Sequence, residues 1–292
     1  MLGLSGGIDS VSLLHHLSHG DREPDFSLSA LHVHHGLSSN ADQWADFCRQ
    51  LCATWKIPLV VVSVTVERDS SDGLEAAARR ARHEAYGRTE GDWVVLAHHR
   101  GDQAETLLFN LLRGTGLAGA AAMASRQRRL LRPLLAASRN DIEAYARAHS
   151  LRWIEDESNR DTGFSRNYLR HEILAPLNQR FPAAEKNMAA AAVRFAEAAT
   201  LLDELATLDL APAAADFPVP VSVLAGLSEP RARNVLRYLL ARRNVRIPSE
   251  SRLIELLRQL LTAAADRHPR VRFGDWDILR RHGQIELERV VA

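Results

Sequence analysis

The segment from Leu4 to Ser10 carries the first residues in the chain that could do phosphate chemistry. It reads Leu-Ser-Gly-Gly-Ile-Asp-Ser and stands between a short apolar start and an apolar helical pattern. Two adjacent glycines let the backbone turn sharply, so its N–H groups, two serine hydroxyls and the following helix N-terminus can bind an anion. The segment lacks the lysine of a kinase-type phosphate loop, which favours chemistry at the α-phosphate. A Gly-Gly turn with an Asp helix cap is the ordinary alternative, and this segment alone does not separate the two.

Asp9 is the unusual member of this loop, because phosphates repel a carboxylate unless a cation lies between them. Mg²⁺ is typically held by one or two carboxylates together with substrate phosphates. We therefore predict that Asp9 contacts Mg²⁺.

A second group of chemical residues follows an apolar run at 93–97. The pair His98 and His99 comes directly after that run, and Asp102 and Glu105 follow at the start of a helical pattern. Ligands of open parallel sheets bind beyond the carboxyl ends of the strands. The spacing i, i+3 puts both carboxylates on one helix face, where they could hold Mg²⁺ or an ammonium group. Acids placed at a helix start for its dipole are the alternative, which leaves the two histidines unexplained.

Two further segments have the composition of ligand-binding loops. Arg113 is followed by three glycines, Gly114, Gly116 and Gly119, and could neutralise developing phosphate charge. A helix C-cap would account for Gly114 only. Four acids at 155–161 precede a cluster of aromatic and arginine residues at 164–170. This cluster is more typical of a nucleic-acid-binding surface than of a plain solvated loop.

The elements that must position these residues alternate between strand and helix patterns, as in a parallel α/β sheet. Short Val- and Leu-rich runs at 28–33, 59–66 and 93–97 predict strands, and helical spacing separates them. The predicted helices are 40–55, 73–86 and 138–149, and 151–154 is predicted as one more short strand. An alanine-rich helix at 183–210 leads to a proline-punctuated linker. Beyond it, helices at 235–242 and 253–262 and strands at 271–273 and 284–287 predict a small α-rich domain.

Composition places the chain among ordinary globular proteins. It has 292 residues, 46% hydrophobic and 25% charged, enough for two domains with a core each. No apolar run approaches the roughly 20 residues of a membrane span, and no leader precedes the first motif, so we expect no membrane and a cytoplasmic location. Cys48 and Cys52 lack a second pair for a metal or cluster and are expected to be buried, reduced thiols.

The charge of the chain is uneven. Its net value is +1, but residues 230–292 carry 14 arginines and 7 acids, a balance of +7 that leaves −6 to the remainder. Arginine suits bidentate phosphate contacts and base stacking. High genomic GC content would give the same arginine bias, yet a basic domain joined to an acidic one favours a nucleic-acid partner.

Six ordered blocks of sequence resemble one family, the tRNA(Ile)-lysidine synthetases, which belong to the N-type ATP pyrophosphatases with a PP-loop. Their order and content carry the resemblance, which covers roughly residues 4–170. The blocks are 5–10 (SGGIDS), 32–37 (HVHHGL), 75–82 (EAAARRAR), 98–106 (HHRGDQAET), 113–114 (RG) and 155–159 (EDESN).

The resemblance implies an α/β fold, with a parallel-sheet catalytic domain of the adenine nucleotide alpha hydrolase type at 1–182. A helical linker at 183–216 and a small α-rich tRNA-binding domain at 217–292 would follow. It implies a ligase that joins L-lysine to C2 of the wobble cytidine in tRNA(Ile) with a CAU anticodon. That reaction consumes ATP with Mg²⁺, passes through an adenylated cytidine, and releases AMP and diphosphate.

The resemblance also distributes roles over residues. Asp9, Asp102 and Arg113 would be catalytic, with Asp9 and Asp102 at Mg²⁺. Asp102 and Glu105 are also candidates for the lysine ammonium, and the sequence does not divide these roles. The residues implied at ATP are Ser5, Gly6, Gly7, Ile8, Asp9, Ser10, His35, Arg113 and Gly114.

The chain departs from the family in three places. The stretch before the glycine loop is short, position 83 is His where an aromatic is usual, and a further C-terminal domain that helps read tRNA is not seen. We therefore expect residues 230–292, including Arg280 and Arg281, to be the main RNA-binding candidate. Two rival functions are another PP-loop tRNA-modifying enzyme, such as a cytidine thiolase, and a non-catalytic nucleotide-binding module. The sequence leaves the oligomeric state open.

Overall fold

The computed structural model describes residues 1–20, 26–67, 69, 73–210, 215–263 and 269–290. The chain forms two compact units, Met1–Ala196 and Glu197–Ala292, and the division falls inside one long helix, α9 (Ala184–Leu210). The predicted boundaries at 182 and 216 remain predictions, and residues 211–214 of the predicted linker lie outside the described residues. None of the helices in the described ranges is long and apolar enough to cross a membrane.

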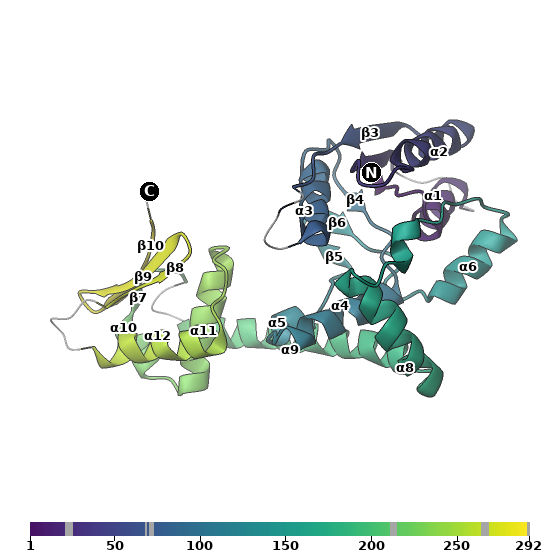
Figure 1. Ribbon diagram of the computed structural model, residues 1–292. Helices are drawn as coiled ribbons and strands as arrows, with labels where there is room; N and C mark the ends of the chain where they lie inside the picture. The colour runs from purple at the N-terminus through teal and green to yellow at the C-terminus, as the bar shows by residue number, and fades with distance from the viewer. Residues whose placement is uncertain (21–25, 68, 70–72, 211–214, 264–268, 291–292) are drawn as a thin grey trace. The chain divides into compact units, whose positions relative to one another are not determined.

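The first unit is built on a six-stranded sheet in the order β3-β2-β1-β4-β6-β5, visible in Figure 1. All neighbours pair in parallel except β5, which runs antiparallel to β6. Leu2 is in register with Ala30 on one side and with Val95 on the other. The strands are β1 (Leu2–Gly3), β2 (Ala30–His34), β3 (Leu59–Ser63), β4 (Val94–Val95), β5 (Arg126–Gln127) and β6 (Leu130–Leu131).

Helices cover both faces of this sheet (Figure 1). One core joins the strands to α1 and α2 through buried Val11, Leu14, Cys48 and Cys52. The other joins them to α3 through Tyr86. The parallel α/β prediction is therefore confirmed, and both cysteines are free and buried as expected. The helices are α1 (Ile8–His19), α2 (Ala41–Thr54), α3 (Leu74–Gly87), α4 (Arg100–Leu112), α5 (Leu117–Ala120) and α6 (Arg139–Ala148).

The chain order across the sheet reverses at β1. From β1 the chain moves to β2 and β3 on one side, and β4 and β6 then lie on the other side. In such sheets the crevice beyond the carboxyl ends of the strands at the reversal is the usual ligand site. The segments that follow β1 and β4, residues 4–7 and 96–99, therefore lie at one edge of the sheet.

Short helical turns connect the sheet to α9. They are η1 (Glu157–Arg160), α7 (Ser165–Tyr168), η2 (Leu169–Leu174) and α8 (Ala175–Arg180). The predicted strand at 151–154 is wrong, because this segment pairs with none of the strands in the described ranges. Leu151 and Trp153 instead pack against the core under α1 and α6. These side chains are apolar because they are buried against helices. A short apolar run in the sequence looks the same whether it is buried against helices or in a sheet.

The second unit packs helices against a four-stranded antiparallel sheet in the order β7-β10-β9-β8. Its core combines leucines of two amphipathic helices, α11 (Glu229–Arg242) and α12 (Glu250–Thr262), with Ile278 and Ile285 of the sheet. The remaining elements are β7 (Val219–Pro220), α10 (Val221–Ala225), β8 (Arg270–Phe273), β9 (Trp276–Arg281) and β10 (Gln284–Arg289). Strand β9 was not predicted, although two of its neighbours were.

Candidate active site

The loop from Ser5 to Ser10 joins β1 to α1 and is braced by its own serines. The hydroxyl of Ser10 donates to the carbonyl of Gly7 at 3.0 Å and accepts from the N–H of Ser5 at 3.2 Å. The hydroxyl of Ser5 accepts from the N–H of Gly7 at 3.3 Å. No side chain of the described residues caps the start of α1, so its first-turn N–H groups remain available to an anion.

Gly6 is required by both the backbone and the surroundings of the loop. Its φ is +89°, and a Cβ atom there would lie 2.7 Å from Cδ1 of Ile154. The N–H of Ile154 donates to the carbonyl of Gly6 at 2.9 Å. The segment before the acidic loop at 155–161 therefore runs directly against the glycine loop.

Asp9 is the second residue of α1 and is partly exposed. Nη1 of Arg139, the first residue of α6, lies 2.8 Å from each of its carboxylate oxygens. Burial raises the pKa of Asp9, and the charges of Arg139 and His99 oppose that effect. Sequence reasoning missed Arg139, since its only visible signal is a position next to the predicted cap Ser138.

The start of α4 holds Asp102 in a fixed orientation. His99 is the N-cap, and its N–H donates to Oδ2 of Asp102 at 2.9 Å, while its Nδ1 accepts from the N–H of Gly101 at 3.0 Å. Oδ1 of Asp102 accepts from Arg170 at 3.3 Å. Burial would raise the pKa of Asp102, but the neighbouring His99 and His98 and these donors outweigh it, so the pKa is lowered.

Glu105 is buried one turn further along α4, with 2% of its surface exposed. Its Oε1 accepts from Nε of Arg170 at 2.5 Å, whereas its Oε2 has no hydrogen-bond partner among the residues that the structure describes. Burial raises the pKa of Glu105 against the opposing charge of Arg170. A buried carboxylate oxygen without a partner is costly, so this atom marks a place where a donor can bind.

The carboxylates of the loop and of α4 surround Arg170 together. Burial would lower the pKa of Arg170, but the charges of Glu105, Asp102 and Asp9 raise it. The structure thus brings the predicted residues of both blocks to one edge of the sheet. Arg170 was seen in the sequence only as part of an aromatic and arginine cluster.

Two histidines of this region are held neutral. Burial lowers the pKa of His35, which follows β2, to about 4, and lowers that of His98, which follows β4, also to about 4. In each ring, Nδ1 is buried and finds no hydrogen-bond partner within the described part of the chain. Nε2 of His35 accepts from Nε of Arg82 at 3.4 Å. Both rings can therefore offer neutral hydrogen-bonding groups to a ligand.

Several arginines gather near His98 and His83. Burial lowers the pKa of Arg79, and three other arginines nearby lower it further. Nε of Arg132 is buried with no hydrogen-bond partner among the described residues, and Nε of Arg166 lies 3.3 Å from Oε1 of Glu75. Such a partly buried group of cations suits phosphate. The neighbouring arginines are Arg82, Arg132 and Arg166.

The structure does not bring Arg113 and Gly114 to the loop. Arg113 is exposed at the C-terminal end of α4, with its guanidinium 5.1 Å from the ring centre of Phe109. A rise of about 1.5 Å per residue separates the Cα atoms of Asp102 and Arg113 by about 16 Å. Their predicted part in binding ATP thus has no geometric support, and it stays a prediction.

The donor set at Asp9 fits a magnesium ion carried by a nucleotide. Its two oxygens already share one cationic group, and Mg²⁺ needs only one or two carboxylates beside phosphates and water. Within the described ranges no three His, Cys, Asp or Glu side chains are grouped to hold a metal, so a cage of protein ligands is not what this arrangement resembles. Asp102 is committed to His99 and Arg170, so its predicted metal contact finds less support than that of Asp9.

The basic tail uses several of its arginines internally. Arg280 donates to the carbonyls of Leu260 and Ala263 at 2.9 and 3.0 Å, and Arg281 pairs with Glu286 and Glu288. The side chain of Arg281 is still 44% exposed, and these internal contacts do not test RNA binding, so the expectation that Arg280 and Arg281 contact RNA stays a prediction. The net charge of a segment does not show which of its arginines already have partners in the folded chain.

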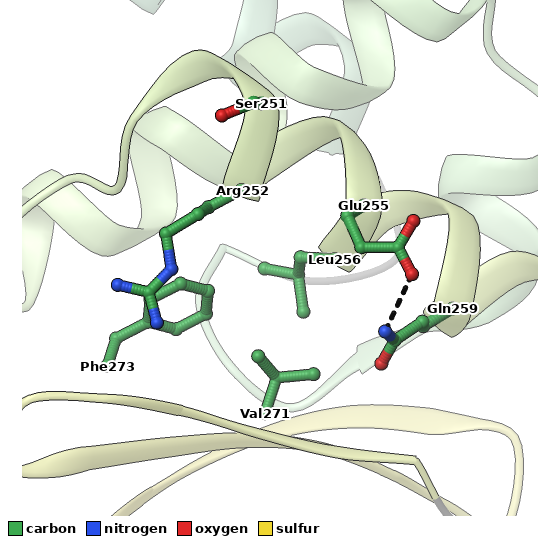
Figure 2. A pocket seen from close by; sticks show the side chains of 7 residues that line it. All are labelled: Ser251, Arg252, Glu255, Leu256, Gln259, Val271 and Phe273. Atoms are coloured by element: carbon green, nitrogen blue, oxygen red, sulfur yellow. Dashed lines mark hydrogen bonds between the residues drawn. The ribbon is translucent and has the colours of Figure 1, made fainter.

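The second unit has a shallow cavity of about 200 Å³ between α12 and β8. Figure 2 shows Arg252 over the ring of Phe273, with the hydrogen bond from Gln259 to Glu255 on the other side. None of the predicted site residues lines it.

Residues 1–177 match the model of the PP-loop domain, and residues 220–285 match that of the TilS substrate binding domain. A solved structure with similar fold is the "U34-tRNA thiolase NcsA from Methanococcus maripaludis with its [4Fe-4S] cluster", with TM-score 0.53 and 18% identity over 67% of this chain and 70% of that one. The glycine loop at the sheet reversal and the family model that matches residues 1–177 define a PP-loop protein.

Curated relatives narrow the class. The tRNA(Ile)-lysidine synthases of Nitrosomonas europaea and Azoarcus sp. (strain BH72) are 42% and 46% identical over 98% of this chain. That of Shigella flexneri is 41% identical over 98% of this chain and 68% of its own length. The chain belongs to the tRNA(Ile)-lysidine synthase family. It spans 64% of the length of the first two relatives.

Proposed function

We propose that this chain catalyses the ATP-dependent joining of lysine to C2 of the wobble cytidine in tRNA(Ile) with a CAU anticodon. Family membership supports the proposal. The observation that carries it is the meeting, at one sheet edge, of a phosphate loop without lysine and the buried, unpartnered Oε2 of Glu105. The first feature suits attack at an α-phosphate, and the second suits an ammonium group.

In the first step, the C2 oxygen of cytidine attacks the α-phosphate of ATP, and the bond to pyrophosphate breaks. The N–H groups of the loop and of the first turn of α1 bind phosphate oxygens. Asp9 would hold the Mg²⁺ of the nucleotide, which neutralises phosphate charge when bound. Asp9 is kept in place by α1, whose Ile8 is buried against α6.

In the second step, the ε-amine of lysine attacks C2 of the adenylated cytidine, the C2–O bond breaks and AMP leaves. The lysine ammonium group must lose one proton to become the attacking amine, and the nitrogen loses a second proton as the C–N bond forms. Glu105 and Asp102 would orient the side chain by accepting hydrogen bonds from the ammonium group. Because burial raises the pKa of Glu105, its carboxylate is a better proton acceptor than an ordinary glutamate.

The RNA must present an accessible base. A cytidine in an anticodon loop can be splayed out, whereas one in a duplex stack is out of reach. The arginine group around Arg79 and the exposed parts of the basic tail are the candidates for phosphate contacts. We propose a cytoplasmic location, since tRNA, ATP and free lysine occur together there.

A thiolase function has less support. Burial raises the pKa of Cys48 to about 12 and that of Cys52 to about 11, which makes both thiols poor nucleophiles and ligands. A module that only binds nucleotide would have little use for the acids beside the phosphate loop.

The test is incorporation of labelled lysine into a tRNA(Ile) transcript bearing CAU, with ATP and Mg²⁺. The comparison is a methionine tRNA transcript with the same anticodon. Incorporation into the tRNA(Ile) transcript alone supports the ligase. If both transcripts are labelled, this chain does not by itself discriminate between the two tRNAs. ATP binding with no tRNA-dependent pyrophosphate release would contradict the proposal in favour of a binding module.

A further inference from the structure

Arg139 occupies the place of a cation on the acid of the phosphate loop. Its Nη1 alone lies 2.8 Å from both Oδ1 and Oδ2 of Asp9. A guanidinium usually meets a carboxylate with two nitrogens, one for each oxygen. One nitrogen shared between two oxygens instead resembles a single cation chelated by a carboxylate.

The neighbouring structure holds both partners in position. Ser138 and Asp141 form a capping box at the start of α6, so the backbone of Arg139 is fixed. Nε of Arg139 donates to Glu143 at 3.1 Å. Ile8, adjacent to Asp9, packs against Ile142 of the same helix. The acid and the guanidinium are thus carried by two helices that share a buried contact.

The dipole of α6 does not favour an arginine at this place. The first turn of a helix disfavours a cation, because the helix dipole is positive there. The start of α1, with its uncapped N–H groups, adds a second positive end nearby. Both helix starts therefore favour an anion at this place. The side chain of Arg139 is 43% exposed, which leaves it room to change partners.

We infer that Arg139 is a phosphate-binding residue that exchanges partners when nucleotide binds. It pairs with Asp9 before ATP arrives, and it binds a phosphate oxygen of ATP once Asp9 turns to the Mg²⁺ of the nucleotide. This inference rests on the proposed function, because it requires ATP at the loop. After the exchange, Asp9 and the phosphate oxygen that Arg139 binds each have a cationic partner.

The experiment measures ATP binding by calorimetry at several Mg²⁺ concentrations, with the whole chain and without tRNA or lysine. The variants are Arg139→Met and Arg139→Lys. The matched control is Arg147→Met, because Arg147 lies on the same helix and pairs with the same Glu143 at 2.9 Å without touching Asp9. Thermal unfolding of each variant checks the fold.

Two results are expected of Arg139→Met. Its affinity for ATP with saturating Mg²⁺ falls about tenfold, the effect of one charge-assisted hydrogen bond. Its half-saturating Mg²⁺ concentration also falls, about threefold or more, because Arg139 no longer competes for Asp9. Arg139→Lys keeps the charge and should retain the wild-type Mg²⁺ midpoint within about twofold. Arg147→Met should match the wild type in both quantities.

An unchanged Mg²⁺ midpoint in Arg139→Met would overturn the exchange, whatever happens to the affinity. Equal losses in Arg139→Met and Arg147→Met would also overturn it, since they would indicate a role in holding α6 alone. If the wild-type chain binds no ATP, the proposed function fails first, and this inference fails with it. The two failures are therefore distinguishable by the wild-type titration.

Discussion

Replacing Glu105 by Gln tests the lysine site most directly, because it changes charge with little change of shape. Glu105 is 2% exposed, and only its Oε1 has a partner, Arg170. If Oε2 receives the lysine ammonium, the change removes one charge-assisted hydrogen bond, worth about 1.5–3 kcal/mol. The KM for lysine should then rise by about ten- to a hundredfold. Arg170 keeps Asp102 as a partner at 3.3 Å.

The same change should not harm the fold near pH 7. Burial raises the pKa of Glu105, so the folded state disfavours its ionised form. At acidic pH the group is protonated in both states and does not destabilise the fold. As pH rises from the ordinary glutamate range through the raised pKa, ionisation of Glu105 lowers the free energy of unfolding. Glu105→Gln should therefore have a melting temperature at pH 7 equal to or above that of the wild type.

The assay separates the two chemical steps. Pyrophosphate release that depends on tRNA reports adenylation and should be unchanged, whereas labelled lysine incorporation at limiting lysine should fall. Glu185→Gln is the control, because Glu185 of α9 pairs at 3.0 Å with Arg100, which lies on α4 like Glu105. A wild-type KM for lysine in Glu105→Gln would refute the assignment, and a loss of adenylation would show that Glu105 serves the first step instead.

Asp9→Ala should keep the circular dichroism spectrum and lose at least about a hundredfold in tRNA-dependent pyrophosphate release, since it removes the Mg²⁺ contact; normal release would contradict that role. Gly6→Ala should lower stability by about 1–3 kcal/mol in thermal unfolding and weaken ATP binding, because of the positive φ and the close neighbour. The folded-state pKa of His98 is about 4, so the stability it supports is present above the unfolded value near 6.5 and is lost as pH falls towards 4. His98→Asn should flatten the loss of stability across that window. Arg280→Glu should lower the melting temperature, whereas exposed Arg246→Glu should spare it and weaken tRNA binding, with a salt dependence reduced by about one unit; equal melting temperatures would contradict the first expectation.

Much of the first unit was predictable because its elements are strongly patterned. The helix predicted at 40–55 is α2, and the strand predicted at 59–66 contains β3. The hairpin of β5 and β6 was missed, because two-residue strands leave no period to detect. The segment 151–154 was wrongly predicted as a strand, because its apolar run packs against helices.

The candidate site was predictable where a motif itself holds the chemistry. The loop around Asp9 and the carboxylates Asp102 and Glu105 were found from residue types and spacing, and their proximity agrees with strand ends in a parallel sheet. Arg139 and Arg170 were not found as partners, because they lie 130 and 68 residues from the acids Asp9 and Asp102 that they contact. Arg113 was predicted at the phosphates and lies at the other end of its helix.

The sequence by itself determined the parallel α/β pattern, the glycine loop and the acids at the start of α4, because local spacing encodes these features. Tertiary structure alone decided which cations those acids meet and which of their oxygens remain unpartnered. It placed β1 between β2 and β4, so two loops distant in sequence share one edge. It also gave some arginines of the tail, such as Arg280 and Arg281, partners within the fold. Long-range packing and burial set these contacts, and neither has a local signature in the chain.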